Sequence, residues 1–112
     1  QAYECGAILN PAGLRQQVEG CIVMALGPAL REEIHYRNGR IANPRFASYP
    51  VPRFRDVPKI DTVLVDLPNE APKGAGETPI IAIAPAIANA VFALTRKPVH
   101  RLPIRAQTAA GE

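Results

Sequence analysis

The sequence is poor in the residues that build most catalytic and metal centres. Its 112 residues include two cysteines, two histidines, one methionine and no tryptophan, and aromatic residues make up only 5%. Cys5 and Cys21 are too few for a disulfide framework and lack a histidine at ligand spacing. We therefore expect buried free thiols and no metal bound by protein ligands. A P-loop, an HExxH motif, a nucleophile elbow and a Ser-His-Asp signature are also missing.

The chain also lacks a concentrated patch of charge. Its net charge is +3 and its pI is near 9.2, but the basic residues are scattered and have no aromatic residues among them. Nucleic-acid-binding proteins gather basic side chains on one face, so we expect no nucleic-acid partner. The longest apolar run, residues 79–94, contains Pro85 and Asn89, and we expect it to fall short of a membrane span.

Hydrophobic residues and prolines are plentiful by comparison. A hydrophobic content of 47% is typical of a folded chain, and this length allows one small domain. Twelve prolines predict long extended segments, because proline fixes φ and removes a backbone donor. We expect an α+β fold with two main helices, short strands and proline-rich extended segments, and a frayed tail at residues 106–112.

Two stretches have helical features. Asn10 and Pro11 form a favourable helix start, since asparagine caps the free amides and proline suits the first position. Apolar residues then recur at helical spacing as far as Leu30. Pro28 should kink or end this helix. A second, alanine-rich helix is predicted from about residue 85 to residue 95.

Alternation of apolar and polar residues predicts strands at residues 2–9 and 59–67. A last short strand is expected at residues 99–104. The pair Asn38-Gly39 predicts a hairpin within residues 31–43, because a type I′ turn needs positive φ at both central positions. Prolines exclude regular structure from most of residues 44–58.

The loop at residues 73–79, Lys-Gly-Ala-Gly-Glu-Thr-Pro, is the most informative stretch. Gly74 and Gly76 let a ligand approach the main chain, whose successive amides can bind an anion, and Glu77 adds a base. Taken alone, such a loop is more often a surface turn with a solvated glutamate. Gln17 is similar: it needs a polar partner if buried, but a half-exposed position at the helix edge explains it better.

Seven motifs in sequence order narrow these alternatives. They are residues 5–11 (CGAILNP), 17–20 (QVEG), 32–33 with 38–39 (EE and NG), 49–52 (YPVP), 74–77 (GAGE), 85–90 (PAIANA) and 101–104 (RLPI). Together they resemble the C-terminal part of the molybdopterin-binding large subunit in the xanthine oxidase family of molybdenum hydroxylases. The isoquinoline 1-oxidoreductase and bacterial aldehyde dehydrogenase branch is the most similar. Residues 1–105 would be a C-terminal part of that cofactor-binding domain.

The resemblance implies a role for each candidate site residue. Glu77 corresponds to the active-site base beside the molybdenum. Gln17 corresponds to the glutamine that hydrogen-bonds an oxo group or the dithiolene end of the pterin. Gly74, Ala75 and Gly76 would line the same pocket with backbone amides. The implied reaction oxidises an aldehyde or an N-heteroaromatic carbon with oxygen derived from water, and the pterin, rather than the protein, ligates the metal.

The resemblance also implies cofactors and partners. The cofactor would be molybdenum with molybdopterin cytosine dinucleotide, and 2Fe–2S clusters would lie on a partner chain. Expected partners are the remainder of the large subunit, an iron–sulfur small subunit and, as in some relatives, a cytochrome c subunit. A periplasmic or inner-membrane-associated bacterial complex is favoured over a cytoplasmic one. Because the family's catalytic subunit is much longer, we expect no activity from the isolated chain.

A non-catalytic alternative remains open. The chain could be a small subunit or fragment that only completes the fold of a partner chain. An alanine-rich helix that is apolar on nearly all sides would suit that role. The two hypotheses differ in whether Glu77 reaches a ligand of the molybdenum.

Overall fold

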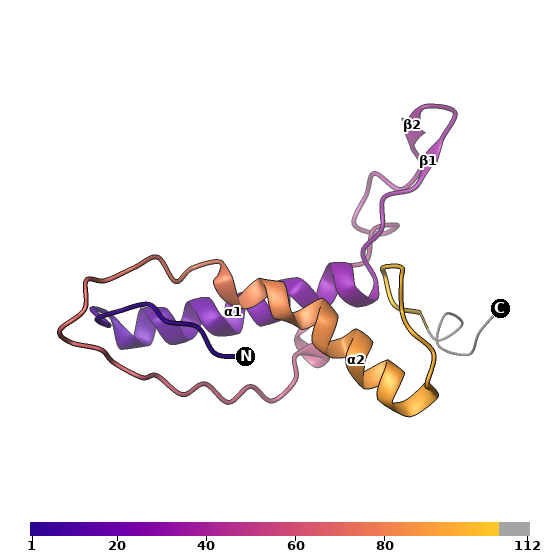
Figure 1. The fold of residues 1–112 in the computed structure, drawn as a ribbon. Helices are drawn as coiled ribbons and strands as arrows, with labels where there is room; N and C mark the ends of the chain where they lie inside the picture. Colours follow the sequence, from indigo (N-terminus) through magenta and orange to yellow (C-terminus); the bar gives the residue numbers. More distant parts are fainter. Residues whose placement is uncertain (106–112) are drawn as a thin grey trace.

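A computed structural model of the protein describes residues 1–105, and two helices dominate it (Figure 1). The expected frayed tail at residues 106–112 lies outside the described residues. In chain order the elements are α1 (Pro11–Leu30), β1 (Tyr36–Arg37), β2 (Arg40–Ile41), the 3-10 helices η1 (Phe54–Asp56) and η2 (Thr78–Ala82), and α2 (Ile83–Thr95). Long extended segments connect them (Figure 1). The expected α+β class, with two main helices and short strands, is confirmed.

α1 begins where the sequence predicted. The Asn10 side chain accepts a hydrogen bond from the Gly13 amide at 2.9 Å, and proline opens the first turn. The helix ends at Leu30, soon after Pro28, as expected. The Gly27 carbonyl, at the end of the helix, accepts the amides of Arg31 and Glu32, each at 2.8 Å.

α2 begins earlier than predicted, because η2 runs directly into it. Pro85 then lies in the first turn of α2, where a helix does not need the missing amide. The combined stretch Thr78–Thr95 has 18 residues and a mean hydropathy of 1.8, with 6% of it buried inside the described structure. By length and composition alone it could cross a membrane. Our expectation that this run falls short was therefore wrong, and the reason is that Pro85 does not interrupt it.

The hairpin at Asn38-Gly39 is present but short. Both residues have positive φ, 51° and 73°, and β1 pairs antiparallel with β2. Both strands are exposed on each face, and the hairpin stands away from the helices (Figure 1). With nothing to pack against, the ladder does not extend. At its base the buried Asn43 side chain accepts from the His35 amide at 2.8 Å and takes the place of a strand partner.

The prediction of a strand at residues 2–9 is wrong, although another segment of the chain lies alongside these residues. This N-terminal segment runs antiparallel to residues 66–78 and makes only scattered contacts with it. Two backbone hydrogen bonds join them, Ala7 N to Glu70 O at 3.3 Å and Lys73 N to Cys5 O at 2.9 Å. Gly6 bends the segment at a φ of 69°, and Pro68 and Pro72 offer no amide, so a continuous ladder cannot form.

The other two predicted strands, at residues 59–67 and 99–104, are also wrong. In residues 59–67 the alternation exists, with Thr62 and Leu64 half-buried and Val63 86% exposed. No strand of the described chain lies beside it, however, and a strand requires a ladder partner. Residues 99–104 contain Pro103 and are tied to the end of α1 through the Ile104 amide and the Ala29 carbonyl, at 2.7 Å.

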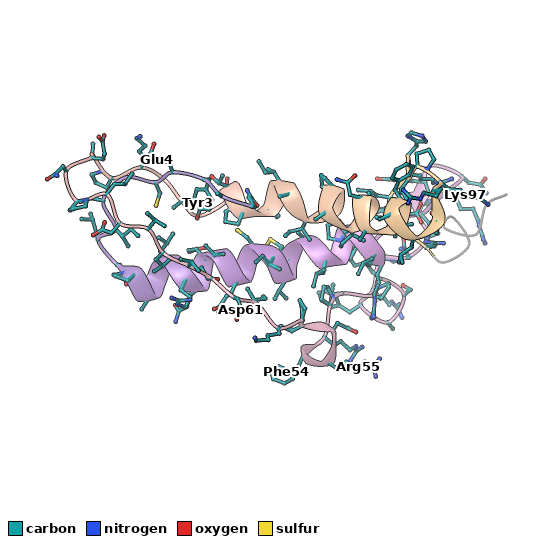
Figure 2. The ribbon with its side chains drawn as sticks, turned by 60° about the horizontal axis from the view of Figure 1, so that its bottom comes forward. Tyr3, Glu4, Phe54, Arg55, Asp61 and Lys97 are labelled. Atoms are coloured by element: carbon teal, nitrogen blue, oxygen red, sulfur yellow. The ribbon has the colours of Figure 1, made fainter. Side chains whose placement is uncertain are left out.

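The chain leaves much apolar surface uncovered. Its radius of gyration is 17.2 Å, against about 13 Å for a compact domain of this length. Its accessible surface is 8584 Å², against about 6,000 Å² for a folded monomer of its mass. Figure 2 shows Phe54 at the outer edge of the molecule, and the most exposed large apolar residues are Leu9, Phe46, Phe54, Val63 and Leu94. Apolar surface of this extent marks a region that another surface covers.

A carboxylate joins η1 to the end of α1 and makes that junction sensitive to pH. Asp56 accepts the Arg53 amide at 2.9 Å and both guanidinium nitrogens of Arg31, at 2.8 Å and 3.1 Å. The Arg53 amide, and after it the Arg31 charge, hold the pKa of Asp56 below its usual 3.8. Because its pKa is lowered, the Asp56 carboxylate stabilises the folded state at pH values above the ordinary aspartate pKa. This stabilisation is lost as the pH falls through the lowered pKa.

We therefore expect Asp56→Asn to destabilise the protein at about pH 5 and to have a smaller effect at about pH 3, because pH 3 lies below the ordinary pKa of an aspartate and part of the stabilisation is lost there. Thermal unfolding of both proteins at the two pH values checks this. Asp61→Asn is the matched control, because the Asp61 side chain is 78% exposed. An equal effect of Asp56→Asn at both pH values would contradict the expectation.

Candidate functional site

The 73–79 loop is held by side chains from two distant parts of the chain. The Tyr3 hydroxyl donates to the Ala75 carbonyl at 3.3 Å, and the Cys21 thiol of α1 donates to the Gly76 carbonyl at 2.8 Å. Further along, the Gln1 side chain donates to the Thr78 carbonyl at 3.2 Å. The loop is therefore bonded to both the N-terminal segment and α1.

Gly6 makes this arrangement possible. A Cβ added at Gly6 would lie 2.1 Å from the Ala71 carbonyl oxygen and 3.4 Å from the Pro72 Cα. Together with a φ of 69°, this close approach of two backbones requires glycine. The N-terminal segment can therefore cross residues 71–72 and bring Tyr3 to the loop.

A pocket of about 330 Å³ lies where the N-terminal segment, the start of α1 and the loop meet. We call it the loop pocket, and its lining includes Gln17, Ala75 and Gly76. Gln17 is more than 50 positions away from the other two in sequence, and the fold brings all three to one cavity. Asn10 and Lys73 contribute further polar groups to the wall.

Gly74 and Glu77 lie on the same loop but do not line this pocket. Glu77 is exposed and immediately precedes η2; its carbonyl accepts the Ile80 amide at 3.1 Å, and its side chain makes no capping bond. The structure thus gathers three of the five predicted site residues in one pocket and places the other two on the adjoining backbone.

The loop can accept a ligand that offers hydrogen-bond acceptors. A Cβ added at Gly74 or Gly76 would meet nothing within 4 Å, so the main chain is open there. The Gly76 and Glu77 amides donate to no backbone acceptor within residues 1–105. Gln17, which is exposed, adds an amide that can both donate and accept. This donor set suits a group that carries oxygen, sulfur or pterin acceptors.

Near the pocket, Lys73 is paired with Glu4, and the Tyr3 hydroxyl is neutral. The Lys73 ammonium binds the Glu4 carboxylate at 2.6 Å, and this hydrogen bond lowers the pKa of Glu4. Burial, and then the Cys5 and Cys21 thiols, raise the pKa of Tyr3, so its hydroxyl keeps the proton that it donates. In the part of the chain that the structure describes, no three His, Cys, Asp or Glu residues gather as a metal-ligand set.

A larger cavity of about 450 Å³ lies between the N-terminal segment, α1 and residues 61–65. None of the predicted site residues lines it, and most of its wall is apolar. Its size reflects the half-covered faces of α1 and of residues 59–67, which leave space between them. We therefore assign the candidate site to the smaller loop pocket.

The contributions of Tyr3 and Cys21 to the loop were not predicted from the sequence. We expected buried free thiols at Cys5 and Cys21; both are free, but only Cys21 is buried, whereas Cys5 is half-buried. The bond from the Cys21 thiol to the loop was not foreseen. One signal was present, because Cys21 lies four residues after Gln17 and so shares its helix face. Nothing in the sequence pattern indicated that Tyr3 would reach Ala75.

The molybdopterin cofactor-binding domain model matches residues 1–58. A nicotinate dehydrogenase chain of Pseudomonas putida is 31% identical over 94% of this chain and 9% of its own length. The aldehyde oxidoreductase molybdenum-binding subunit PaoC of Escherichia coli is 40% identical over 88% of this chain and 14% of its own. The beta chain of isoquinoline 1-oxidoreductase from Brevundimonas diminuta is 33% identical over 93% and 13%.

Solved structures of molybdenum hydroxylases have the same fold in this region. Quinoline 2-oxidoreductase from Pseudomonas putida is 29% identical, with a TM-score of 0.77 over 89% of this chain and 14% of that chain. The Cu,Mo-CO dehydrogenase is also 29% identical, with a TM-score of 0.67 over 81% and 12%. The chain spans 9% to 14% of the curated relatives named above. It belongs to the molybdopterin cofactor-binding domain family, as part of a molybdenum-binding subunit of the xanthine oxidase family.

Proposed function

We propose that this chain forms one wall of the active site in a molybdenum hydroxylase that oxidises an aldehyde or an N-heteroaromatic carbon with oxygen derived from water. The observation that carries the proposal is that Gln17, Ala75 and Gly76 line one pocket. Glu77 follows Gly76 directly in the sequence. The relatives support the substrate class, since their names specify an aldehyde, an isoquinoline and a nicotinate.

In this proposal each residue has a separate task. Glu77 is the general base, and its exposed carboxylate takes a proton at the reacting centre. Gln17 orients the cofactor by hydrogen bonds from its amide group. Gly74, Ala75 and Gly76 border the cofactor with main chain, because larger side chains there would keep it at a distance. When bound, the molybdenum cofactor supplies the oxygen-transfer and electron-accepting chemistry.

The proposal extends to cofactors and partners. We assign molybdopterin cytosine dinucleotide to the loop pocket and 2Fe–2S clusters to a partner chain, an iron–sulfur small subunit. A cytochrome c subunit and a periplasmic or inner-membrane-associated location complete the proposed bacterial complex. The isolated chain is inactive in this account, because much of the cofactor and substrate pocket lies outside it.

The large exposed apolar surface indicates that another large protein surface covers this chain. Val63 and Leu94, on separate segments, are 86% and 87% exposed. The relatives are roughly seven to eleven times longer than the region they share with this chain, since that region is 14% and 9% of their lengths. We therefore propose that the remainder of the large subunit, rather than a lipid bilayer, covers α2 and residues 59–67.

One observation favours the non-catalytic alternative. Glu77 lies outside the loop pocket, as expected if the chain only completes a neighbour's fold. Turnover of Glu77→Gln in the intact complex separates the two functions, because a chain that only completes a neighbour's fold does not need this carboxylate.

Gln17 gives the test of cofactor binding. In the intact complex, Gln17→Leu should weaken cofactor retention roughly tenfold, because it leaves ligand groups without their partner. Metal analysis, with mass spectrometry of the pterin nucleotide, measures the content after dialysis. Gln16→Leu is the matched control, since Gln16 is exposed on the same helix but does not line the pocket. Equal content in both variants would contradict this role for Gln17.

A further inference from the structure

Two consecutive carbonyls of the 73–79 loop are bonded to side chains. Tyr3 donates to the carbonyl of Ala75, and Cys21 donates to that of Gly76. The two donors come from different elements, the N-terminal segment and α1, and Figure 2 shows Tyr3 near the start of the helical rod that η2 and α2 form. Each peptide unit next to Gly76 is therefore fixed by its own side chain.

Because each peptide unit is planar, a fixed carbonyl also fixes the direction of the amide in the same unit. Within residues 1–105 the cis peptide bond is at Leu102–Pro103, so both peptide units around Gly76 are trans. In a trans unit the N–H points opposite to the C=O. The Gly76 amide therefore points away from Tyr3, and the Glu77 amide points away from Cys21 and α1. Each amide is thus turned away from the side chain that holds its peptide unit.

We propose that Tyr3 and Cys21 are positioning residues for the site, and this inference rests on the proposed function. They hold the two peptide units on either side of Gly76 and so fix the directions of the Gly76 and Glu77 amides, together with the backbone from which the Glu77 carboxylate projects. Neither side chain needs to touch cofactor or substrate. Burial suits Cys21 to this task, because water cannot easily replace its thiol at the Gly76 carbonyl.

The test measures loop order directly in the intact complex. Tyr3→Phe and Cys21→Ala each remove one donor and should raise hydrogen exchange of the amides in residues 74–78 by about threefold to tenfold. Turnover should fall by about tenfold at nearly unchanged KM, because the base is misplaced while substrate contacts remain. Cofactor content should stay at the wild-type level.

Two matched variants sharpen the result. Tyr36→Phe removes a hydroxyl from the exposed hairpin and should change neither loop exchange nor turnover. Cys21→Ser keeps a donor at the Gly76 carbonyl and should restore most of the protection that Cys21→Ala loses. If Cys21→Ala does not assemble, Tyr3→Phe, which removes one oxygen atom, still gives the test.

The outcomes separate this inference from the proposed function. Unchanged loop exchange in both Tyr3→Phe and Cys21→Ala would overturn the positioning role, whatever the cofactor content. Serine behaving like alanine at Cys21 would also overturn it, since volume rather than hydrogen bonding would then matter. A wild-type complex without molybdenum would overturn the proposed function, while the exchange experiment would still decide whether the two side chains fix the loop.

Discussion

Replacing Glu77 with glutamine should lower turnover by about two to four orders of magnitude and leave the molybdenum cofactor in place. Glutamine has nearly the same size but cannot take a proton at neutral pH, and a lost general base typically costs this much. The cofactor should remain bound because its proposed contacts are Gln17 and the loop backbone. Steady-state kinetics and metal analysis of the same preparation check both parts of the expectation.

Glu70→Gln is the control for that experiment. Glu70 is exposed and uses its backbone carbonyl, rather than its side chain, to hold the N-terminal segment. It should therefore retain turnover. Full turnover in Glu77→Gln would remove the base assignment and favour the view that this chain only completes a fold.

Replacing Gly6 with alanine should be the most damaging small change to the fold. The substitution combines a positive φ with a Cβ that would lie 2.1 Å from the Ala71 carbonyl oxygen, a backbone atom that cannot simply rotate away. We expect a cost of about 2–5 kcal/mol from strain and overpacking. The N-terminal segment would be displaced, and the loop would lose its bond to Tyr3.

Denaturant unfolding of the assembled protein measures this cost, and Gly20→Ala is the control. A Cβ at Gly20 would meet nothing within 4 Å in the middle of α1, so alanine should be neutral or stabilise the helix by up to about 1 kcal/mol. Equal stability of the Gly6→Ala and wild-type proteins would show that the two backbones do not cross as described.

Features set by local sequence were predictable, and features set by distant partners were not. Asn10 caps a helix and Asn38-Gly39 closes a turn because each acts on its own neighbours. The strand prediction at residues 59–67 failed because a strand also needs a chain beside it. Alternation alone does not provide that chain, and residues 1–105 contain none at that edge.

The candidate site also contains residues that could be predicted from the sequence and contacts that could not. Gln17 and the 74–77 motif could be selected by their resemblance to a family, and the fold brings Gln17 beside Ala75 and Gly76. The bond from Tyr3 depends on how Gly6 lets one backbone cross another, and the bond from Cys21 depends on where α1 lies against the loop. Such a crossing joins segments that are far apart in the chain, such as Gly6 and Ala71, and leaves no periodic pattern in the sequence.

The most direct test of the central claim is an experimental structure of the intact, molybdenum-loaded complex. The proposed function predicts that the Gln17 side chain and the Gly74–Gly76 backbone border the cofactor, with the Glu77 carboxylate within hydrogen-bond reach of a ligand of the molybdenum. It also predicts that the remainder of the subunit covers α2. A loop pocket filled by protein, with the cofactor elsewhere and Glu77 in solvent, would contradict it.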